Sequence, residues 1–168
     1  MKKYLITILL ILPAFAVSAQ DLSLYQKKYF VAAGDTMPYR LLLPENFNPK
    51  KAYPLILFLH GAGERGSDNE KQLVHGGKLF LKDSIRKNYP AIVLFPQCMA
   101  NSYWSNVAFQ FDSTGKRLAF LFKTDSAPTK AMQMAIELIK SMMSEFTIQK
   151  NKIYVGGLSM GGMGTFEI

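Results

Sequence analysis

The stretch of sequence that decides the fold is Ile153-Tyr154-Val155-Gly156-Gly157-Leu158-Ser159-Met160-Gly161-Gly162-Met163-Gly164. It contains a β-branched and aromatic run, then a Gly-x-Ser-x-Gly turn, then a glycine-rich segment compatible with a helix. This order of strand, sharp turn and helix is the context in which a serine hydroxyl is held exposed at the end of a strand. A side chain at Gly157 or Gly161 would collide with so tight a turn. We therefore interpret Ser159 as a nucleophile; the alternative is a glycine-rich turn whose serine only caps the helix.

A second motif lies upstream. The unbroken apolar run Pro54-Leu55-Ile56-Leu57-Phe58-Leu59 predicts a central strand covered on both faces. It leads into a glycine-dense loop, His60-Gly61-Ala62-Gly63-Glu64-Arg65-Gly66. Glycines in such a loop let main-chain amides approach a ligand, because no side chain blocks them.

With these two motifs, the chain resembles secreted α/β-hydrolase serine esterases, the group that contains phospholipase/carboxylesterase, polyhydroxybutyrate-depolymerase-like and feruloyl/acetyl-xylan esterase-like proteins. The segments Leu43-Pro44-Glu45-Asn46-Phe47 and Phe95-Pro96-Gln97 also match this group. The resemblance implies an α/β-hydrolase fold with a mostly parallel, doubly wound sheet. It also implies an oxyanion hole made by the backbone amides of Ala62 and Met160.

The resemblance further implies a catalytic triad in the chain order serine, acid, histidine. Residues 161–168 contain Glu167 but no histidine. We therefore expect residues 20–168 to be the N-terminal part of one α/β-hydrolase domain, truncated before the catalytic Asp and His and inactive alone. Neither His60 nor His75 is assigned as the base: a structural role is expected for His60, and an exposed or packed position near the site for His75.

The expected function is hydrolysis of carboxylic esters through a covalent acyl-enzyme on Ser159, without a cofactor or metal. The substrate is expected to be a small-molecule or polysaccharide-linked ester, with Trp104 and Glu64 as candidate lining residues. Packing of its own loop explains Trp104 equally well. Two alternatives remain open, a prolyl-oligopeptidase-type serine peptidase and a non-catalytic carbohydrate- or surface-binding protein on the same fold.

The N-terminus predicts export. Residues 1–19 have a basic start, a short apolar run and small residues before Gln20, which is typical of a signal peptide. A periplasmic or secreted protein without a stable membrane span after cleavage is expected. The net charge of +8 is spread over scattered basic pairs, which indicates a solvated surface and no nucleic-acid partner. Cys98 is the only cysteine and is expected to be a small buried residue.

The remaining segments predict the scaffold. Strands are expected at residues 29–32, 39–43 and 91–95, and an amphipathic helix at 128–146. A less regular helix is expected around residues 69–82. Residues 97–125 are expected to form a long loop that shapes the substrate pocket.

Overall fold

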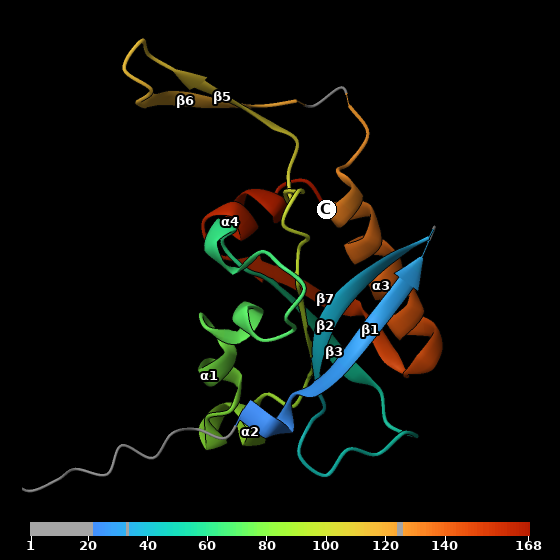
Figure 1. Cartoon of the computed structure of the whole chain (residues 1–168). Coiled ribbons are helices and arrows are strands. Elements are labelled where there is room, and N and C mark those ends of the chain that lie inside the picture. The colour runs from blue at the N-terminus through green and yellow to red at the C-terminus, as the bar shows by residue number, and fades with distance from the viewer. Residues whose placement is uncertain (1–21, 33, 124–125) are drawn as a thin grey trace, which may run out of the picture.

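The computed structural model describes residues 22–32, 34–123 and 126–168. The expected signal peptide, residues 1–19, lies outside the described residues. Five strands form one sheet in the order β1-β2-β4-β3-β7 (Figure 1). In chain order these strands are β1 (Gln26–Ala32), β2 (Asp35–Leu42), β3 (Tyr53–Leu59), β4 (Ile92–Pro96) and β7 (Ile148–Gly157).

The sheet is mixed, which corrects the prediction of a mostly parallel one. Strands β4, β3 and β7 run parallel to one another, whereas β1 pairs antiparallel with β2, and β2 pairs antiparallel with β4. The short turn between β1 and β2 explains the difference, because only an antiparallel pair can be joined by so few residues. Gly34 makes this turn possible with φ of 82°.

The two faces of the sheet are covered unequally. Alternate residues of β3 point to opposite faces, and Leu55, Leu57 and Leu59 are fully buried under helix α3 (Lys130–Glu145). On the other face, Ile56 and Phe58 are only partly buried. This second face carries four short helical segments, which are η1 (Leu22–Leu24), η3 (Lys71–Leu73), α1 (Gly77–Phe80) and α2 (Asp83–Asn88). The prediction that β3 is covered on both faces is therefore correct for one face and only partly correct for the other.

Helix α3 agrees with the helix predicted at residues 128–146. The Thr129 hydroxyl oxygen accepts a hydrogen bond from the Met132 amide at 3.1 Å and so caps the first turn. The buried face of α3 includes Met132, Leu138 and Met142, which are packed in the main core. The less regular helix expected around residues 69–82 is not one continuous helix. It is divided into η3 and α1, which are separated by the turn at Gly76, where φ is 91°.

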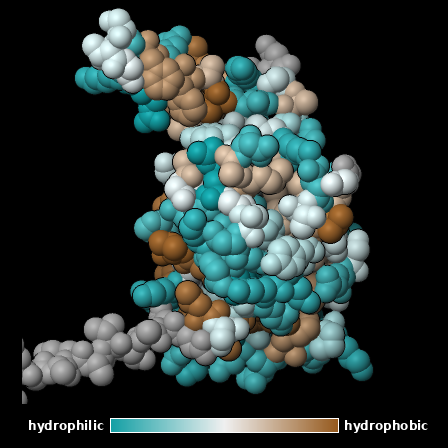
Figure 2. Space-filling model, viewed as in Figure 1, coloured by the Kyte–Doolittle hydropathy of each residue, from teal (hydrophilic) through white to brown (hydrophobic). Residues whose placement is uncertain are grey.

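A β-hairpin replaces much of the long loop expected at 97–125. Strands β5 (Val107–Phe111) and β6 (Arg117–Phe122) pair antiparallel and stand away from the sheet, beyond α4 (Met160–Gly164), as Figure 1 shows. Exposed apolar side chains gather on this hairpin, which appears in Figure 2 as the upper projection where tan and brown atoms lie beside teal and white ones. They are Phe111, Leu118, Phe120, Leu121 and Phe122.

Candidate active site

Ser159 sits at the sharp turn between β7 and α4. Its backbone has φ of 51° and ψ of −115°, a conformation that costs a residue with a side chain roughly 1–3 kcal/mol. Neighbouring hydrogen bonds hold this conformation in place. The Leu158 amide donates to the Leu59 carbonyl at 3.1 Å, and the Met163 amide donates to the Ser159 carbonyl at 3.0 Å. The turn is thus fastened both to the end of β3 and to the helix that follows.

The two glycines that flank the serine are required sterically, as the sequence predicted. A Cβ at Gly161 would lie 1.9 Å from the Leu59 carbonyl oxygen. A Cβ at Gly157 would lie 2.5 Å from the carbonyl carbon and oxygen of Gly161. These neighbours are backbone atoms of the sheet and the turn, so they cannot move aside as a flexible side chain would.

The glycine-dense loop after β3 meets this turn. It forms a short helical segment, η2 (Ala62–Glu64), and a Cβ placed on Gly61 would lie 3.8 Å from the Cβ of Ser159. The amides of Ala62 and Met160 donate no hydrogen bond to another group in the part of the chain that the structure describes. Ala62 is partly buried, whereas Met160 is fully buried, so a substrate oxygen would reach the Met160 amide only after a local adjustment.

His60 is a structural residue of this loop. Its Nδ1 lies 2.6 Å from the Gly61 carbonyl, and its Nε2 accepts a hydrogen bond from the Cys98 amide at 2.9 Å. Because Nε2 accepts, the proton lies on Nδ1 and the ring is neutral. Burial lowers the pKa of His60, since a charged imidazole would lose its hydration. Both ring nitrogens are occupied, as expected for a histidine that does not act as the base.

The structure places Trp104, a candidate substrate-lining residue, in the core of the described chain. It is fully buried, and its indole N–H donates to the His60 carbonyl at 3.1 Å. The Trp104 and His60 rings also meet edge to face, with centroids 5.3 Å apart. Packing of its own loop, the other explanation considered for Trp104, accounts for these contacts. Cys98 is buried, and burial raises its pKa to about 12, so this thiol is not a nucleophile at neutral pH.

Glu64 lies beside the serine turn. Its side chain is 15% exposed, and its Oε1 is 3.7 Å from Nε2 of His75, whose side chain is 60% exposed. Gly61 separates Glu64 from Ser159, because the Cβ position of Gly61 lies 2.9 Å from Oε2 of Glu64. The structure therefore brings together three elements that were quoted separately from the sequence: the serine, the glycine loop and Glu64. Ser159 forms no hydrogen bond with either histidine among the described residues.

A buried polar network holds the loop that carries Glu64, and sequence reasoning missed it. Gln97 follows β4 and is fully buried; its side-chain amide donates to the Glu64 carbonyl at 3.1 Å and accepts from the Asn69 amide at 2.7 Å. Arg40 of β2 is also buried and donates to the Asn69 carbonyl at 2.6 Å. The available signal was a polar residue inside or directly after an apolar strand, since such residues are buried only when they find partners.

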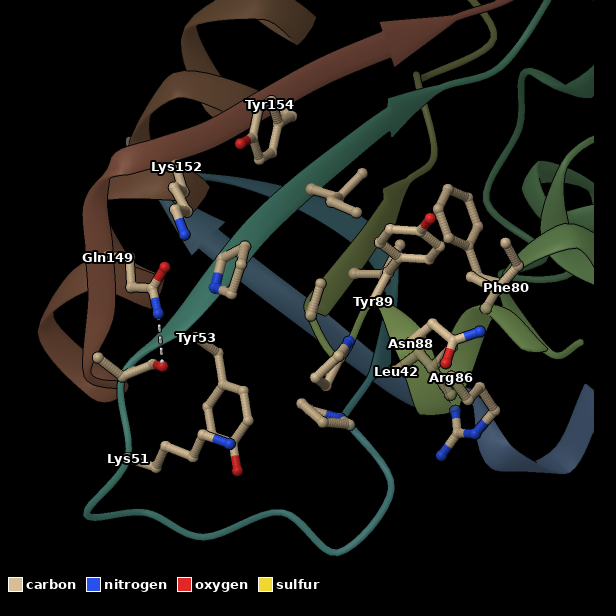
Figure 3. A pocket seen from close by; sticks show the side chains of 18 of the residues that line it. Leu42, Lys51, Tyr53, Phe80, Arg86, Asn88, Tyr89, Gln149, Lys152 and Tyr154 are labelled. Carbon is tan, nitrogen blue, oxygen red and sulfur yellow. Dashed lines mark hydrogen bonds between the residues drawn. The ribbon is translucent and has the colours of Figure 1, made fainter. Parts of the chain in front are cut away.

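A groove lies at the other edge of the sheet, where the strands have their amino ends. It has a volume of about 650 Å³ and is lined where β3 and β7 begin by Tyr53, Ile56 and Tyr154, with Tyr89 facing them from the end of α2 (Figure 3). Ser159 follows the carboxyl end of β7, so this groove and the candidate site are on opposite edges. In open α/β sheets, ligands bind at the carboxyl edge of the strands.

The described residues contain no group of three or more His, Cys, Asp or Glu side chains placed to hold a metal ion. No helix in the same ranges is long and apolar enough to cross a membrane.

Comparison with known proteins points to esterases. No protein-family model and no curated protein matches the chain. Among solved structures, a thermostable esterase is 36% identical with a TM-score of 0.71, over 86% of this chain and 36% of that one. A feruloyl esterase module from Clostridium thermocellum, complexed with sinapinate, is 18% identical with a TM-score of 0.53, over 84% of this chain and 47% of that one. A ferulic acid esterase from Anaeromyces mucronatus is 18% identical with a TM-score of 0.50, over 82% of this chain and 50% of that one.

The chain thus spans about a third to a half of the length of these esterases. The two feruloyl esterases establish the fold alone, which is α/β-hydrolase-like. The thermostable esterase adds sequence identity along most of the chain, and together the neighbours support an esterase class of hydrolase.

Proposed function

We propose that this protein hydrolyses carboxylic esters with Ser159 as the nucleophile. The observation that carries the proposal is the conformation of Ser159, a non-glycine residue at φ of 51° directly after a strand of the sheet, with the Gly61 loop against it. Strained backbone of this kind is kept where function needs it. Similarity to a thermostable esterase along 86% of the chain supports the same reaction class.

In the proposed mechanism, Ser159 attacks the ester carbonyl and forms an acyl-enzyme, which water then hydrolyses. The amides of Ala62 and Met160 stabilise the oxyanion, and removing one such donor typically costs about 3–4 kcal/mol of transition-state stabilisation. A histidine oriented by an Asp or Glu takes the serine proton. We propose that both residues come from chain beyond Ile168, since His60 is engaged at both ring nitrogens.

The proposed substrates are esters of small molecules or esters attached to polysaccharides. No cofactor, nucleic acid or membrane span is part of the proposal. The esterase neighbours do not favour the peptidase or the non-catalytic binding protein considered from the sequence.

The test is covalent labelling of the full-length protein with a fluorophosphonate probe. Peptide mapping should find the label on Ser159, and Ser159→Ala should abolish labelling and lower ester turnover by several orders of magnitude, as loss of a triad member does. Ser144→Ala, which removes an exposed hydroxyl on α3, is the matched control and should change neither. Labelling at another residue, or full turnover by Ser159→Ala, would refute the assignment.

We also propose that residues 1–19 are removed on export, leaving residues 20–168 as part of the mature periplasmic or secreted domain. Intact-mass measurement of the exported protein should give Gln20 as the first residue. A mature form that keeps Met1 would contradict this proposal.

A further inference from the structure

We infer that Glu64 and His75 form a subsite that binds a hydroxyl group of the ester substrate beside Ser159. This inference rests on the proposed function, and it adds the chemical class of substrate: esters that carry a free hydroxyl near the scissile bond. The inference depends on where Glu64 lies and on the fact that its carboxylate lacks a hydrogen-bond donor among the described residues. It also depends on the orientation of Arg65, the distance to His75 and the hydrogen bonds that hold the loop.

Glu64 is placed at the nucleophile by Gly61. The point where a Cβ on Gly61 would lie is 3.8 Å from the Cβ of Ser159 and 2.9 Å from Oε2 of Glu64. The carboxylate therefore occupies space that any residue other than glycine would take. A substrate whose carbonyl carbon contacts the Ser159 hydroxyl has its neighbouring atoms within reach of this carboxylate.

The Glu64 carboxylate lacks a hydrogen-bond donor in the part of the chain that the structure describes. Its one ionic neighbour there is His75, with Oε1 and Nε2 3.7 Å apart, which is longer than a hydrogen bond. The side chain is 15% exposed, and its oxygens are not among the described buried atoms that lack a partner, so they remain accessible from solvent. A substrate hydroxyl can therefore reach the carboxylate and donate to it in place of water.

The adjacent residue, Arg65, does not donate a hydrogen bond to the Glu64 carboxylate. Arg65 turns away from Glu64 and donates to the Ala62 carbonyl at 3.0 Å and to the Ser102 carbonyl at 3.2 Å. Its guanidinium also lies over the Tyr103 ring, 5.8 Å from the centroid. The carboxylate thus remains available as an acceptor.

The gap between Glu64 and His75 selects a hydroxyl over an ammonium group. One side of the gap is a carboxylate, which only accepts hydrogen bonds, and the other is an imidazole nitrogen that can donate. A hydroxyl can donate to the first while it accepts from the second, whereas an ammonium group has donors only. His75 is 60% exposed, so its ring has room to adjust to the bound group.

The backbone of Glu64 is held rigidly enough to discriminate. Its carbonyl accepts from the buried Gln97 side chain at 3.1 Å, and its amide donates to the Gly61 carbonyl at 3.4 Å. Because these partners belong to the loops after β4 and β3, the backbone that carries the Glu64 side chain is held at a fixed position beside the serine turn. A polar group carried on a fixed backbone can favour a hydroxylated substrate over its deoxy analogue.

The experiment compares three esters with the full-length protein. Propyl butyrate carries no hydroxyl, glyceryl monobutyrate carries hydroxyls on the alcohol part, and propyl 4-hydroxybutyrate carries one on the acyl part. We expect kcat/KM to be about tenfold higher for one of the hydroxylated esters than for its plain counterpart, the difference that one good hydrogen bond provides. Which of the two is preferred identifies the side of the scissile bond that faces Glu64.

Substitutions at Glu64 and Gly61 test whether these residues cause the preference for a hydroxylated ester. Glu64→Leu should remove the roughly tenfold preference, because leucine offers no acceptor, and Glu64→Gln should retain part of it through the amide oxygen. Gly61→Ala should also reduce the preference, since its Cβ would displace the flexible end of Glu64. Glu45→Leu removes an exposed carboxylate elsewhere and should leave the preference unchanged.

Two different results would overturn the inference. If the wild-type protein hydrolyses all three esters through Ser159 without preference, or if Glu64→Leu lowers all three rates alike, the subsite is wrong and the proposed function stands. If no ester is hydrolysed in a Ser159-dependent way, the proposed function fails and the subsite fails with it.

Discussion

At the scale of single residues, the site depends on positions where a side chain is excluded. Ser159 adopts a positive φ that disfavours any residue with a Cβ, and the turn tolerates it because Gly157 and Gly161 let the chain approach the end of β3. These glycines were predictable from the spacing of the motif, and the nearest collision that Gly157 avoids, with Gly161, lies within the turn itself. The carbonyl of Leu59, which Gly161 approaches, was not predictable, since it belongs to a strand about a hundred residues earlier in the sequence.

Gly161→Ala should destabilise the protein by at least 1–3 kcal/mol, the usual cost of overpacking, because its Cβ would lie 1.9 Å from the Leu59 carbonyl oxygen. Gly162→Ala is the matched control within α4. Its Cβ would meet its nearest neighbour, the Gly157 carbonyl oxygen, at 3.6 Å, so this change should be neutral or slightly stabilising. Urea unfolding of the two variants measures both effects. Equal midpoints for the two would contradict the close approach of α4 to β3.

His60 should make stability depend on pH. Burial lowers the pKa of His60 below its usual value of about 6.5, so below about pH 6.5 the unfolded chain binds a proton that the folded protein does not. The free energy of unfolding should therefore fall as pH decreases through 6.5, by up to about 1.4 kcal/mol per pH unit from this group. Chemical unfolding between pH 5 and 8 measures the slope.

His60→Gln should flatten this part of the pH profile, whatever its effect on absolute stability. A slope that persists unchanged in His60→Gln would contradict the buried, neutral state assigned to His60.

At the scale of elements, the long helix was predictable and the hairpin was missed. Apolar residues at helical spacing and an early proline predicted residues 128–146, and α3 spans Lys130–Glu145. The hairpin also had a local signal, since Asp112-Ser113-Thr114-Gly115 separates two runs rich in phenylalanine. The Asp112 carboxylate accepts from the Thr114 and Lys116 amides at 2.9 and 3.0 Å, and Gly115 has φ of 82°. Local turn chemistry therefore forms the hairpin.

Thr129→Ala should lower the free energy of unfolding by about 1 kcal/mol, the typical cost of losing an N-cap. The Thr129 hydroxyl accepts from the Met132 amide at 3.1 Å and donates to the Tyr103 carbonyl at 2.6 Å, so it fastens α3 to the loop after β4. Ser144→Ala, on the same helix, removes an exposed hydroxyl and should be neutral. Thermal or urea unfolding compares the stabilities of the two variants. An equal loss of stability in both would contradict the capping role of Thr129.

At the scale of the whole molecule, the sheet has one densely packed face and one face with a groove. The α3 face holds the larger core, and the opposite face opens into the groove of about 650 Å³ where β3 and β7 begin. The sequence predicted burial of both faces because the run from Pro54 to Leu59 is uniformly apolar. Apolar composition shows that a strand prefers burial on both sides, but the covering layers come from distant segments.

Substitutions at adjacent positions of β3 test this asymmetry. Leu57→Ala should cost about 2–5 kcal/mol, since Leu57 is fully buried under α3. Ile56→Ala should cost clearly less, because Ile56 is only partly buried and lines the groove. Urea unfolding of both variants in the full-length protein makes the comparison. An equal cost would mean that the groove face is packed as tightly as the α3 face in the intact protein.

The sequence by itself determined the local features of this protein: the turn at Ser159, its two glycines, the apolar strand with its glycine loop, and the long helix. Each of these depends on residues close together in the chain, through steric exclusion, periodicity or capping. Only the tertiary structure decided that the sheet is mixed, that Trp104 is buried against His60, and that Glu64 lies beside Ser159 with a carboxylate that lacks a donor among the described residues. These features depend on contacts between segments far apart in sequence, and such contacts are set by how the layers pack rather than by any local pattern.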